Sequence, residues 1–176
     1  MKRKLLSNEL NRLSVDEFKK SEKIPIIVVL DNIRSLSNIG SAFRTADAFR
    51  IEAIYLCGIT AQPPHREIHK TALSATESVD WQYFSTTQEA IKQLKDNDFS
   101  ILSVEQVEGS IMLNDFKPIP NTKYALVFGN EVKGVEDVVV SMSEHCIEIP
   151  QWGTKHSFNV SVSIGIVLWD IVLKLK

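Results

Sequence analysis

Residues 24–58, with the sequence IPIIVVLDNIRSLSNIGSAFRTADAFRIEAIYLCG, contain the pattern that decides the fold. The runs Ile24–Leu30 and Ala53–Ile59 are short, almost continuously apolar and rich in β-branched residues, as expected of strands buried in a parallel sheet. Between them, residues 38–50 place their apolar side chains on one helical stripe, formed by Ile39, Ala42, Phe43, Ala46 and Phe49. This stretch therefore predicts a strand, a helix and a second strand joined by a crossover.

The same alternation continues along the chain. Further strands are predicted at Phe99–Val104, Tyr124–Phe128 and Cys146–Ile149, and further helices at residues 66–74, 87–96 and 135–144. Before the first strand, apolar residues of the segment Leu5–Ser21 recur at near-helical spacing among charges, which predicts an amphipathic helix. We therefore predict an α/β protein with a parallel sheet flanked by helices. A helical extension covers residues 1–23, and one domain covers residues 24–176.

The C-terminal segment is predicted to be a long buried helix. One apolar face comprises Val160, Ile164, Val167, Leu168, Ile171 and Leu175, and a second comprises Val162, Ile166, Trp169 and Leu173. Because the two faces cover most of the surface of the helix, we expect most of it to be buried. Ser157 and Asn159 precede it, where one residue would suffice as a helix cap. The surplus of polar groups indicates a binding site.

The composition is that of an ordinary soluble globular protein, with 44% hydrophobic and 24% charged residues among 176. We find no signal peptide and no membrane-spanning stretch, so we predict a cytoplasmic protein without membrane contact. Cys57 and Cys146 lie in apolar segments and are interpreted as buried hydrophobes, and no metal-ligand spacing occurs. A net charge of −2 argues against a generally basic nucleic-acid coat, although local basic clusters exist, including His65, Arg66, His69 and Lys70.

Three stretches place polar residues after predicted strands, where ligands bind in open α/β sheets. The first carries Asn38 at the expected start of a helix and Arg44 on its polar face; a capped amphipathic helix with a surface arginine is the alternative. The second is the loop Gly129–Gly134 around Glu131, which is neither a Walker loop nor a dinucleotide motif, and whose carboxylate could simply face solvent. The third runs from Ile149 to Asn159.

Together these stretches resemble the three motifs of the SpoU (TrmH-like) branch of the SPOUT RNA methyltransferases. The matching segments are SNIGSAFRTADAF (37–49), LVFGNEVKG (126–134) and IEIPQWGTKHSFNVSVSIGIVLWD (147–170). The resemblance extends from about Pro25 to the C-terminus and preserves both order and spacing. It implies a SPOUT fold, which is a Rossmann-like parallel sheet flanked by helices with a C-terminal deep trefoil knot. It also implies S-adenosylmethionine as cofactor, a homodimer, and methyl transfer to a ribose 2'-hydroxyl of RNA.

The resemblance also assigns residues. By motif matching, Asn38 and Arg44 are catalytic or position the substrate, Glu131 supports the active site, and Ser157 and Asn159 line it. The residues expected to hold the cofactor are Gly129, Ile149, Ser157, Phe158 and Glu105. Arg44 is either the general base or a phosphate ligand, and both roles stay open because a guanidinium is a poor base. Two positions depart from the family pattern: Phe158 replaces the usual Leu or Met, and Ser74 stands where Gly is common.

Family members that act on ribosomal RNA often carry an additional N-terminal RNA-binding domain, whereas here only residues 1–23 precede the first predicted strand. The resemblance therefore favours transfer RNA over ribosomal RNA as the substrate. A ribosomal-RNA 2'-O-methyltransferase is the alternative within the class. The alternative from another class is a noncatalytic RNA-binding protein that retains the knot.

Overall fold

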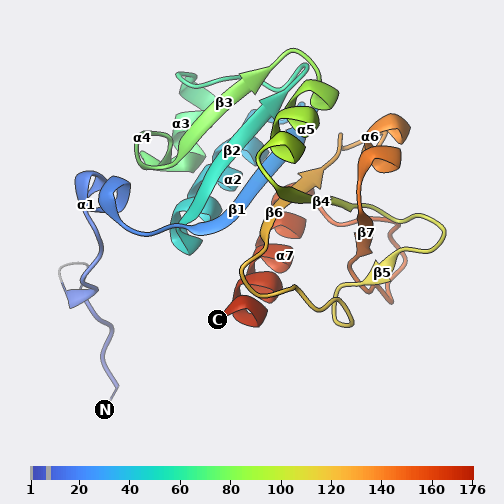
Figure 1. Ribbon diagram of the computed structural model, residues 1–176. Coiled ribbons are helices and arrows are strands. Elements are labelled where there is room, and N and C mark those ends of the chain that lie inside the picture. The colour runs from blue at the N-terminus through green and yellow to red at the C-terminus, as the bar shows by residue number, and fades with distance from the viewer. Residues whose placement is uncertain (1, 7–8) are drawn as a thin grey trace.

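The computed structural model describes residues 2–6 and 9–176 (Figure 1). The helices are α1 (Val15–Lys20), α2 (Leu36–Phe49), α3 (Arg66–Ala72), α4 (Ala75–Ser78), α5 (Thr87–Asp96), α6 (Asp137–Met142) and α7 (Val160–Leu175). The strands are β1 (Ile24–Asp31), β2 (Ile51–Cys57), β3 (Asp80–Phe84), β4 (Phe99–Val104), β5 (Ile111–Met112), β6 (Lys123–Phe128) and β7 (His145–Glu148). The strands form one parallel sheet in the order β3-β2-β1-β6-β4-β7-β5, which confirms the predicted α/β class.

Strand β6 separates β1 from β4, and this arrangement creates the edge on which the site is built. In the register of the sheet, Phe128 at the end of β6 lies beside Leu30 of β1 on one side and Val104 of β4 on the other. Val104 in turn pairs with Ile147 of β7. The carboxyl ends of these four strands therefore reach the same level, and the loops that follow them emerge side by side.

Alternating side chains of the central strands contribute to two separate cores. On β1, Val28 and Leu30 pack in the larger core with residues of α2, α3 and α7. Ile27 and Val29 point to the opposite face, where α5 and α6 cover them. Figure 1 shows α5 and α2 on opposite faces of the sheet. Because the central strands bury residues on both faces of the sheet, their sequences are almost continuously apolar, as predicted.

The C-terminal helix forms as predicted but is not buried all round. Its first face, represented by Ile164 and Val167, is buried against the sheet and α2. On the second face, Val162, Trp169 and Leu173 remain 48%, 59% and 53% exposed. The prediction of an almost fully buried helix is therefore wrong for this chain alone, because the sheet and one neighbouring helix cover only one stripe of it.

The N-terminal helix is shorter than the predicted Leu5–Ser21. Among the described residues of this segment the α-helix covers Val15–Lys20; Ser14 caps it and exchanges hydrogen bonds with Glu17 in a capping box. Phe18 is the one residue of this helix that is buried. Residues 7–8 of the predicted helix lie outside the described residues. The leucines outside the helix, Leu5, Leu6, Leu10 and Leu13, are exposed, so no packing stabilises a longer helix.

Other boundaries differ for local reasons. Strand β2 starts two residues earlier than predicted and ends at Cys57, because Gly58 adopts a φ of +62° and leaves the strand. Helix α3 ends at Ala72, followed by Leu73 and Ser74 with φ values of +49° and +68°. Ser74 thus adopts the left-handed conformation that glycine accommodates most easily, which explains why glycine suits this position. Strands β3 and β5 and helix α4 were not predicted.

Candidate active site

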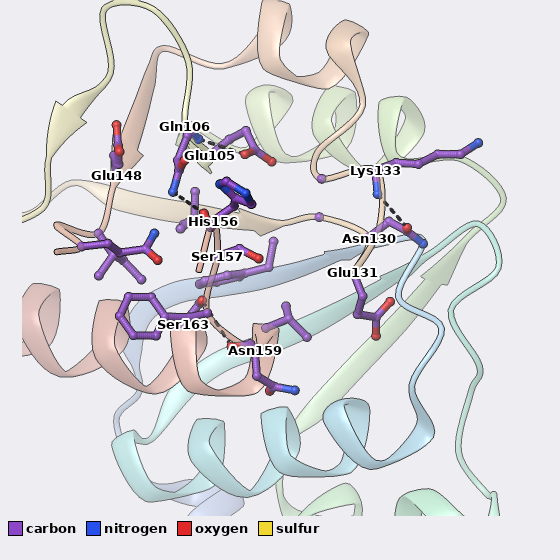
Figure 2. Close-up of a pocket in the computed structure, with 18 of the residues that line it drawn as sticks. Glu105, Gln106, Asn130, Glu131, Lys133, Glu148, His156, Ser157, Asn159 and Ser163 are labelled. Atoms are coloured by element: carbon purple, nitrogen blue, oxygen red, sulfur yellow. Dashed lines mark hydrogen bonds between the residues drawn. The ribbon is translucent and has the colours of Figure 1, made fainter. Parts of the chain in front are cut away.

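A cleft of about 530 Å³ lies at the carboxyl ends of β4, β6 and β7 (Figure 2). Three segments form its walls: residues 104–106 after β4, residues 128–134 after β6, and residues 147–160 after β7. Of the residues singled out from the sequence, seven line the cleft: Glu105, Gly129, Glu131, Ile149, Ser157, Phe158 and Asn159. The stretches after β6 and β7 thus converge on one site as predicted, whereas the stretch after β1 contributes no lining residue and the end of β4 takes its place.

The loop after β6, Gly129–Gly134, is closed on itself. Asn130 and Gly134 exchange two backbone hydrogen bonds of 3.0 and 2.9 Å, and the Asn130 side chain accepts the N–H groups of Val132 and Lys133. The closure requires glycine at position 129, because a Cβ there would lie 2.1 Å from the carbonyl carbon of Gly134. Hydrogen bonds within the chain therefore fix the shape of this wall before any ligand binds.

Glu131 connects this loop to the start of α2. Its carboxylate accepts the backbone N–H groups of Arg34 and Ser35, each at 3.0 Å, and the side-chain amide of Asn38 at 3.2 Å. Burial disfavours the charged form, but these hydrogen bonds, together with the backbone N–H of Glu131 itself, outweigh it and hold the pKa of the Glu131 carboxyl below its ordinary value. The ionised carboxylate therefore orients the Asn38 amide at the edge of the cleft.

The structure corrects the predicted position of Asn38. Asn38 lies inside the first turn of α2, and the helix cap is Ser35, whose hydroxyl accepts the N–H of Asn38. A serine three residues earlier in the sequence supplies the capping oxygen, which leaves the buried Asn38 amide free to bond Glu131. Asn38 is therefore part of the site through its side chain rather than as a cap.

Arg44 is not brought into the cleft. It lies on the exposed side of α2, nearly two turns beyond Asn38, and is absent from the residues that line the cleft. Its guanidinium makes no hydrogen bond or ion pair with any residue among 2–6 and 9–176. Helical spacing correctly predicted its outward direction, but within one chain that direction leads to solvent.

The segment after β7 forms the second wall and is held more loosely. Gln106 donates a hydrogen bond of 3.0 Å to the backbone oxygen of His156 (Figure 2). Asn159 caps α7 and accepts the N–H of Ser161 at 2.9 Å, while the Ser157 hydroxyl has no hydrogen-bond partner in the described part of the chain. Trp152 is 92% exposed and Phe158 40% exposed. The polar and apolar groups of this wall are thus available to groups outside the chain.

Two carboxylates anchor the segment that follows the closed loop. Glu105, at the end of β4, accepts the backbone N–H of Val135 at 2.9 Å. Asp31, fully buried at the end of β1, accepts the next N–H, that of Glu136, at 3.0 Å and the Thr87 hydroxyl at 2.5 Å. β4 and β1, the strands on either side of β6, therefore hold two consecutive backbone N–H groups through Glu105 and Asp31. The end of the loop is thus fixed from both sides.

The sequence analysis missed Asp31, Gln106 and His156. Asp31 could have been found from the sequence, because it is the first polar residue after the predicted strand Ile24–Leu30. The site residues after the other strands were singled out by the same kind of position. Gln106 and His156 had no such signal, because their contact joins segments 50 residues apart.

Among the described residues, no group of three or more His, Cys, Asp or Glu side chains could hold a metal ion. Burial raises the pKa of the Cys57 thiol to about 12, so this cysteine stays protonated and unreactive at neutral pH. Cys146 is half-buried rather than fully buried as predicted. Within the described residues, no helix is long and apolar enough to cross a membrane.

Comparison with known sequences identifies relatives among RNA methyltransferases. An uncharacterized tRNA/rRNA methyltransferase of Borreliella burgdorferi is 31% identical over 92% of this chain and 69% of the relative. The 23S rRNA (guanosine-2'-O-)-methyltransferase RlmB of Neisseria meningitidis is 30% identical over 82% of this chain and 56% of the relative. A tRNA (guanosine(18)-2'-O)-methyltransferase of Aquifex aeolicus is 28% identical over 94% of this chain. The chain spans between 56% and 76% of the length of these relatives.

Solved structures and a family model agree with these relatives. The AdoMet-bound rRNA methyltransferase of Sinorhizobium meliloti superposes with a TM-score of 0.80 at 23% identity, covering 94% of this chain and 62% of that one. The model of the SpoU rRNA methylase family matches residues 25–169. The predicted resemblance is therefore confirmed, and the chain belongs to the SpoU rRNA methylase family.

Proposed function

We propose that this protein transfers a methyl group from S-adenosylmethionine to a ribose 2'-hydroxyl of RNA. The observation that carries the proposal is the convergence of the second and third motif segments on one cleft at the strand ends, with the first motif joined to it where Glu131 accepts the Asn38 amide. Two relatives named for guanosine-2'-O methylation support the choice of the hydroxyl as acceptor.

The cleft fits the cofactor in size and in the chemistry of its walls. Its volume of about 530 Å³ lies within the range of small-molecule sites. Ile149 and Phe158 offer apolar surface for the adenine, Gly129 lets backbone approach closely, and the Ser157 hydroxyl has no partner among the described residues. These residues, with Glu105, would hold S-adenosylmethionine, which when bound supplies a methyl group on an electrophilic sulfonium.

The protein's own contribution is positioning and removal of one proton. The amides of Asn38 and Asn159 would orient the ribose hydroxyl so that its oxygen faces the methyl group; alignment of this kind contributes about 7–11 kcal/mol to catalysis. Forming the oxygen–methyl bond releases the hydroxyl proton. Arg44 either accepts that proton or binds the phosphate beside the target ribose while Ser157 or water accepts it.

A homodimer explains the two features that one chain leaves incomplete. Arg44 lies outside the cleft of its own chain, and the neighbouring helix α7 exposes Val162, Trp169 and Leu173. Helices α2 and α7 pack side by side, so a second copy that covers the apolar face of α7 would also lie beside Arg44. We therefore propose that the dimer buries this face and directs Arg44 to the partner subunit's cleft.

The C-terminal trefoil knot is also part of the proposal. Strand β7 lies between β4 and β5, the two ends of the connection 105–110. That connection contacts the C-terminal segment through Gln106, which bonds the His156 backbone, and through Ser110, which bonds Glu148. These contacts support passage of residues 145–160 through the loop that follows β4.

Transfer RNA is the proposed substrate, with ribosomal RNA as the alternative. The relative named for transfer RNA is covered over 76% of its length, against 56% for RlmB. The test is incubation of the purified protein with labelled S-adenosylmethionine and separated tRNA and rRNA, followed by nucleoside mass spectrometry. We expect one 2'-O-methylated nucleoside in tRNA. Incorporation only into rRNA supports the alternative substrate, and RNA binding without incorporation contradicts the proposed activity.

A further inference from the structure

A second groove of about 560 Å³ lies between α3 and α4 at the start of the edge strand β3, and none of its residues lines the cleft described above. Figure 1 shows α3 and α4 beside β3. Ile68, which is buried, and Trp81, which is half-buried, provide its apolar floor. Arg66 and His69 of α3 form one wall, while Thr76 and Glu77 of α4 form the other.

Apart from His65, whose Nδ1 accepts the N–H of Glu67, four side chains of this groove that can form hydrogen bonds have no partner among the described residues. The side chains of Arg66, His69, Glu77 and Trp81 make no hydrogen bond or ion pair with any other residue that the structure describes. Adjacent residues of α3 behave differently: Lys70 pairs with Glu67 at 2.7 Å. The groove therefore presents an aromatic surface, a cation and a carboxylate whose hydrogen-bonding capacity is available to a ligand.

The groove is rigidly connected to the active-site edge. Helix α3 packs directly on α2 at Gly40, where a Cβ would lie 2.3 Å from the backbone oxygen of Ile68. The Thr71 hydroxyl donates to the backbone oxygen of Ser37, the residue before Asn38. Arg66 lies five residues before Thr71, about 8 Å along the helix axis. A polymer bound with one unit at Asn38 can therefore extend to the groove.

We propose that this groove binds one nucleotide of the substrate RNA that flanks the methylated position. The base would stack on the Trp81 indole, Arg66 and His69 would bind its phosphate, and Glu77 would accept a hydrogen bond from an exocyclic amino group. Unstacked RNA bases are recognised by aromatic stacking and by contacts to their edges, and arginine is suited to phosphate. This inference rests on the proposed function, since the occupant is the RNA substrate.

The groove chemistry distinguishes a nucleotide from other ligands. An apolar floor between a cationic wall and an anionic wall matches a molecule with a flat ring, an anionic group and amino donors on the opposite edge. Adenine, cytosine and guanine carry an exocyclic amino group and uracil does not, so a carboxylate at this edge predicts a preference for these three bases over uracil.

The test measures fluorescence anisotropy of fluorescein-labelled ten-nucleotide oligoadenylate, oligocytidylate and oligouridylate. For the wild type we expect tighter binding of oligoadenylate and oligocytidylate than of oligouridylate. Arg66→Ala should weaken all three by about fivefold through loss of a phosphate contact. Glu77→Gln should abolish the preference against oligouridylate. Lys92→Ala, on α5 and the opposite face of the sheet, is the matched surface-charge control and should change nothing.

Steady-state methyl transfer then separates this inference from the proposed function. In Arg66→Ala we expect a raised KM for RNA with kcat and the KM for S-adenosylmethionine unchanged, which a general loss of folding would not produce. Unchanged anisotropy in Arg66→Ala, or an unchanged base preference in Glu77→Gln, contradicts the groove assignment even if the wild type is active. Absence of methyl transfer in the wild type contradicts the proposed function, whatever the oligonucleotides show.

Discussion

The two principal walls of the cleft differ in how their shape is fixed. The loop Gly129–Gly134 is closed by its own backbone hydrogen bonds and is tied to α2 through Glu131. The segment 149–159 is linked to the loop after β4 at His156 and exposes Trp152 almost completely. The first wall is therefore preorganised within the chain. The second offers surfaces that, in the proposed function, the cofactor and a second subunit would cover.

Arg44 belongs to neither wall, and its replacement should have the largest effect. Arg44→Ala should lower kcat for methyl transfer by more than about 100-fold, the scale typical of a lost proton-transfer or charge-stabilising group. The Kd for S-adenosylmethionine, measured by calorimetry, should stay near that of the wild type because Arg44 is proposed to act on the ribose hydroxyl or its phosphate and is not among the residues proposed to hold the cofactor.

Arg44→Lys sharpens this result, because lysine keeps the charge but loses the planar fork that binds phosphate. A raised KM for RNA with little change in kcat in Arg44→Lys favours the phosphate role, whereas a lowered kcat with an unchanged KM favours the proton-transfer role. Full turnover by Arg44→Ala would remove Arg44 from the mechanism.

The sequence predicted the strands whose residues are buried on both faces, because such strands are recognisable as continuous apolar runs. Strands β1 and β6 are apolar on both faces, and both were recognised. The edge strand β3 was missed although Trp81 and Tyr83 alternate with polar residues, because the strand has five residues and only Phe84 at its end is buried.

Long-range contacts explain what the sequence could not show about the site. Polar residues after β6 and β7 indicated where the cleft lies, whereas those after β1 lie outside its lining. Helical spacing gave the direction of Arg44 relative to its own helix, but not what lies in that direction. The second apolar face of α7 was visible in the sequence, whereas its exposure depends on how many neighbours the fold provides.

The preorganised wall depends on Asp31. Asp31→Ala should lower the free energy of unfolding by about 3 kcal/mol, because it leaves the Thr87 hydroxyl and the Glu136 N–H without their charged acceptor in a buried place. Urea denaturation measures the loss. Thr87→Val removes one of these bonds and should cost about 1 kcal/mol. Wild-type stability in Asp31→Ala would mean that the loop is fixed by other contacts.

Glu131→Gln tests the connection between the first wall and α2. We expect a loss of about 1 kcal/mol in unfolding free energy at neutral pH, since the carboxylate is partly exposed and its hydrogen bonds are screened. The folded-state pKa is lowered, so this stabilisation is present above the ordinary glutamate pKa and disappears as the pH falls through the folded-state value. A wild-type advantage that persists or grows in acid contradicts the assigned role of the charge.

A substitution in the second wall, the segment after β7, should change the free energy of unfolding least. Trp152→Ala should change the unfolding free energy by less than about 0.5 kcal/mol, because its side chain is 92% exposed. The measurement is denaturation at a protein concentration where sedimentation shows monomers. A loss above 1 kcal/mol under these conditions would show that the second wall, like the first, is stabilised within one chain.

Subunit mixing tests most directly the claim that one chain builds the preorganised wall and its partner supplies Arg44. Arg44→Ala and Glu131→Ala variants, each inactive alone and each folded by circular dichroism, are unfolded together and refolded as a mixture. Random pairing makes half of the dimers heterodimers with one intact site of two, so we predict recovery of about one quarter of wild-type methyl transfer. A mixture that stays as inactive as its components would show that Arg44 and Glu131 must act in the same chain.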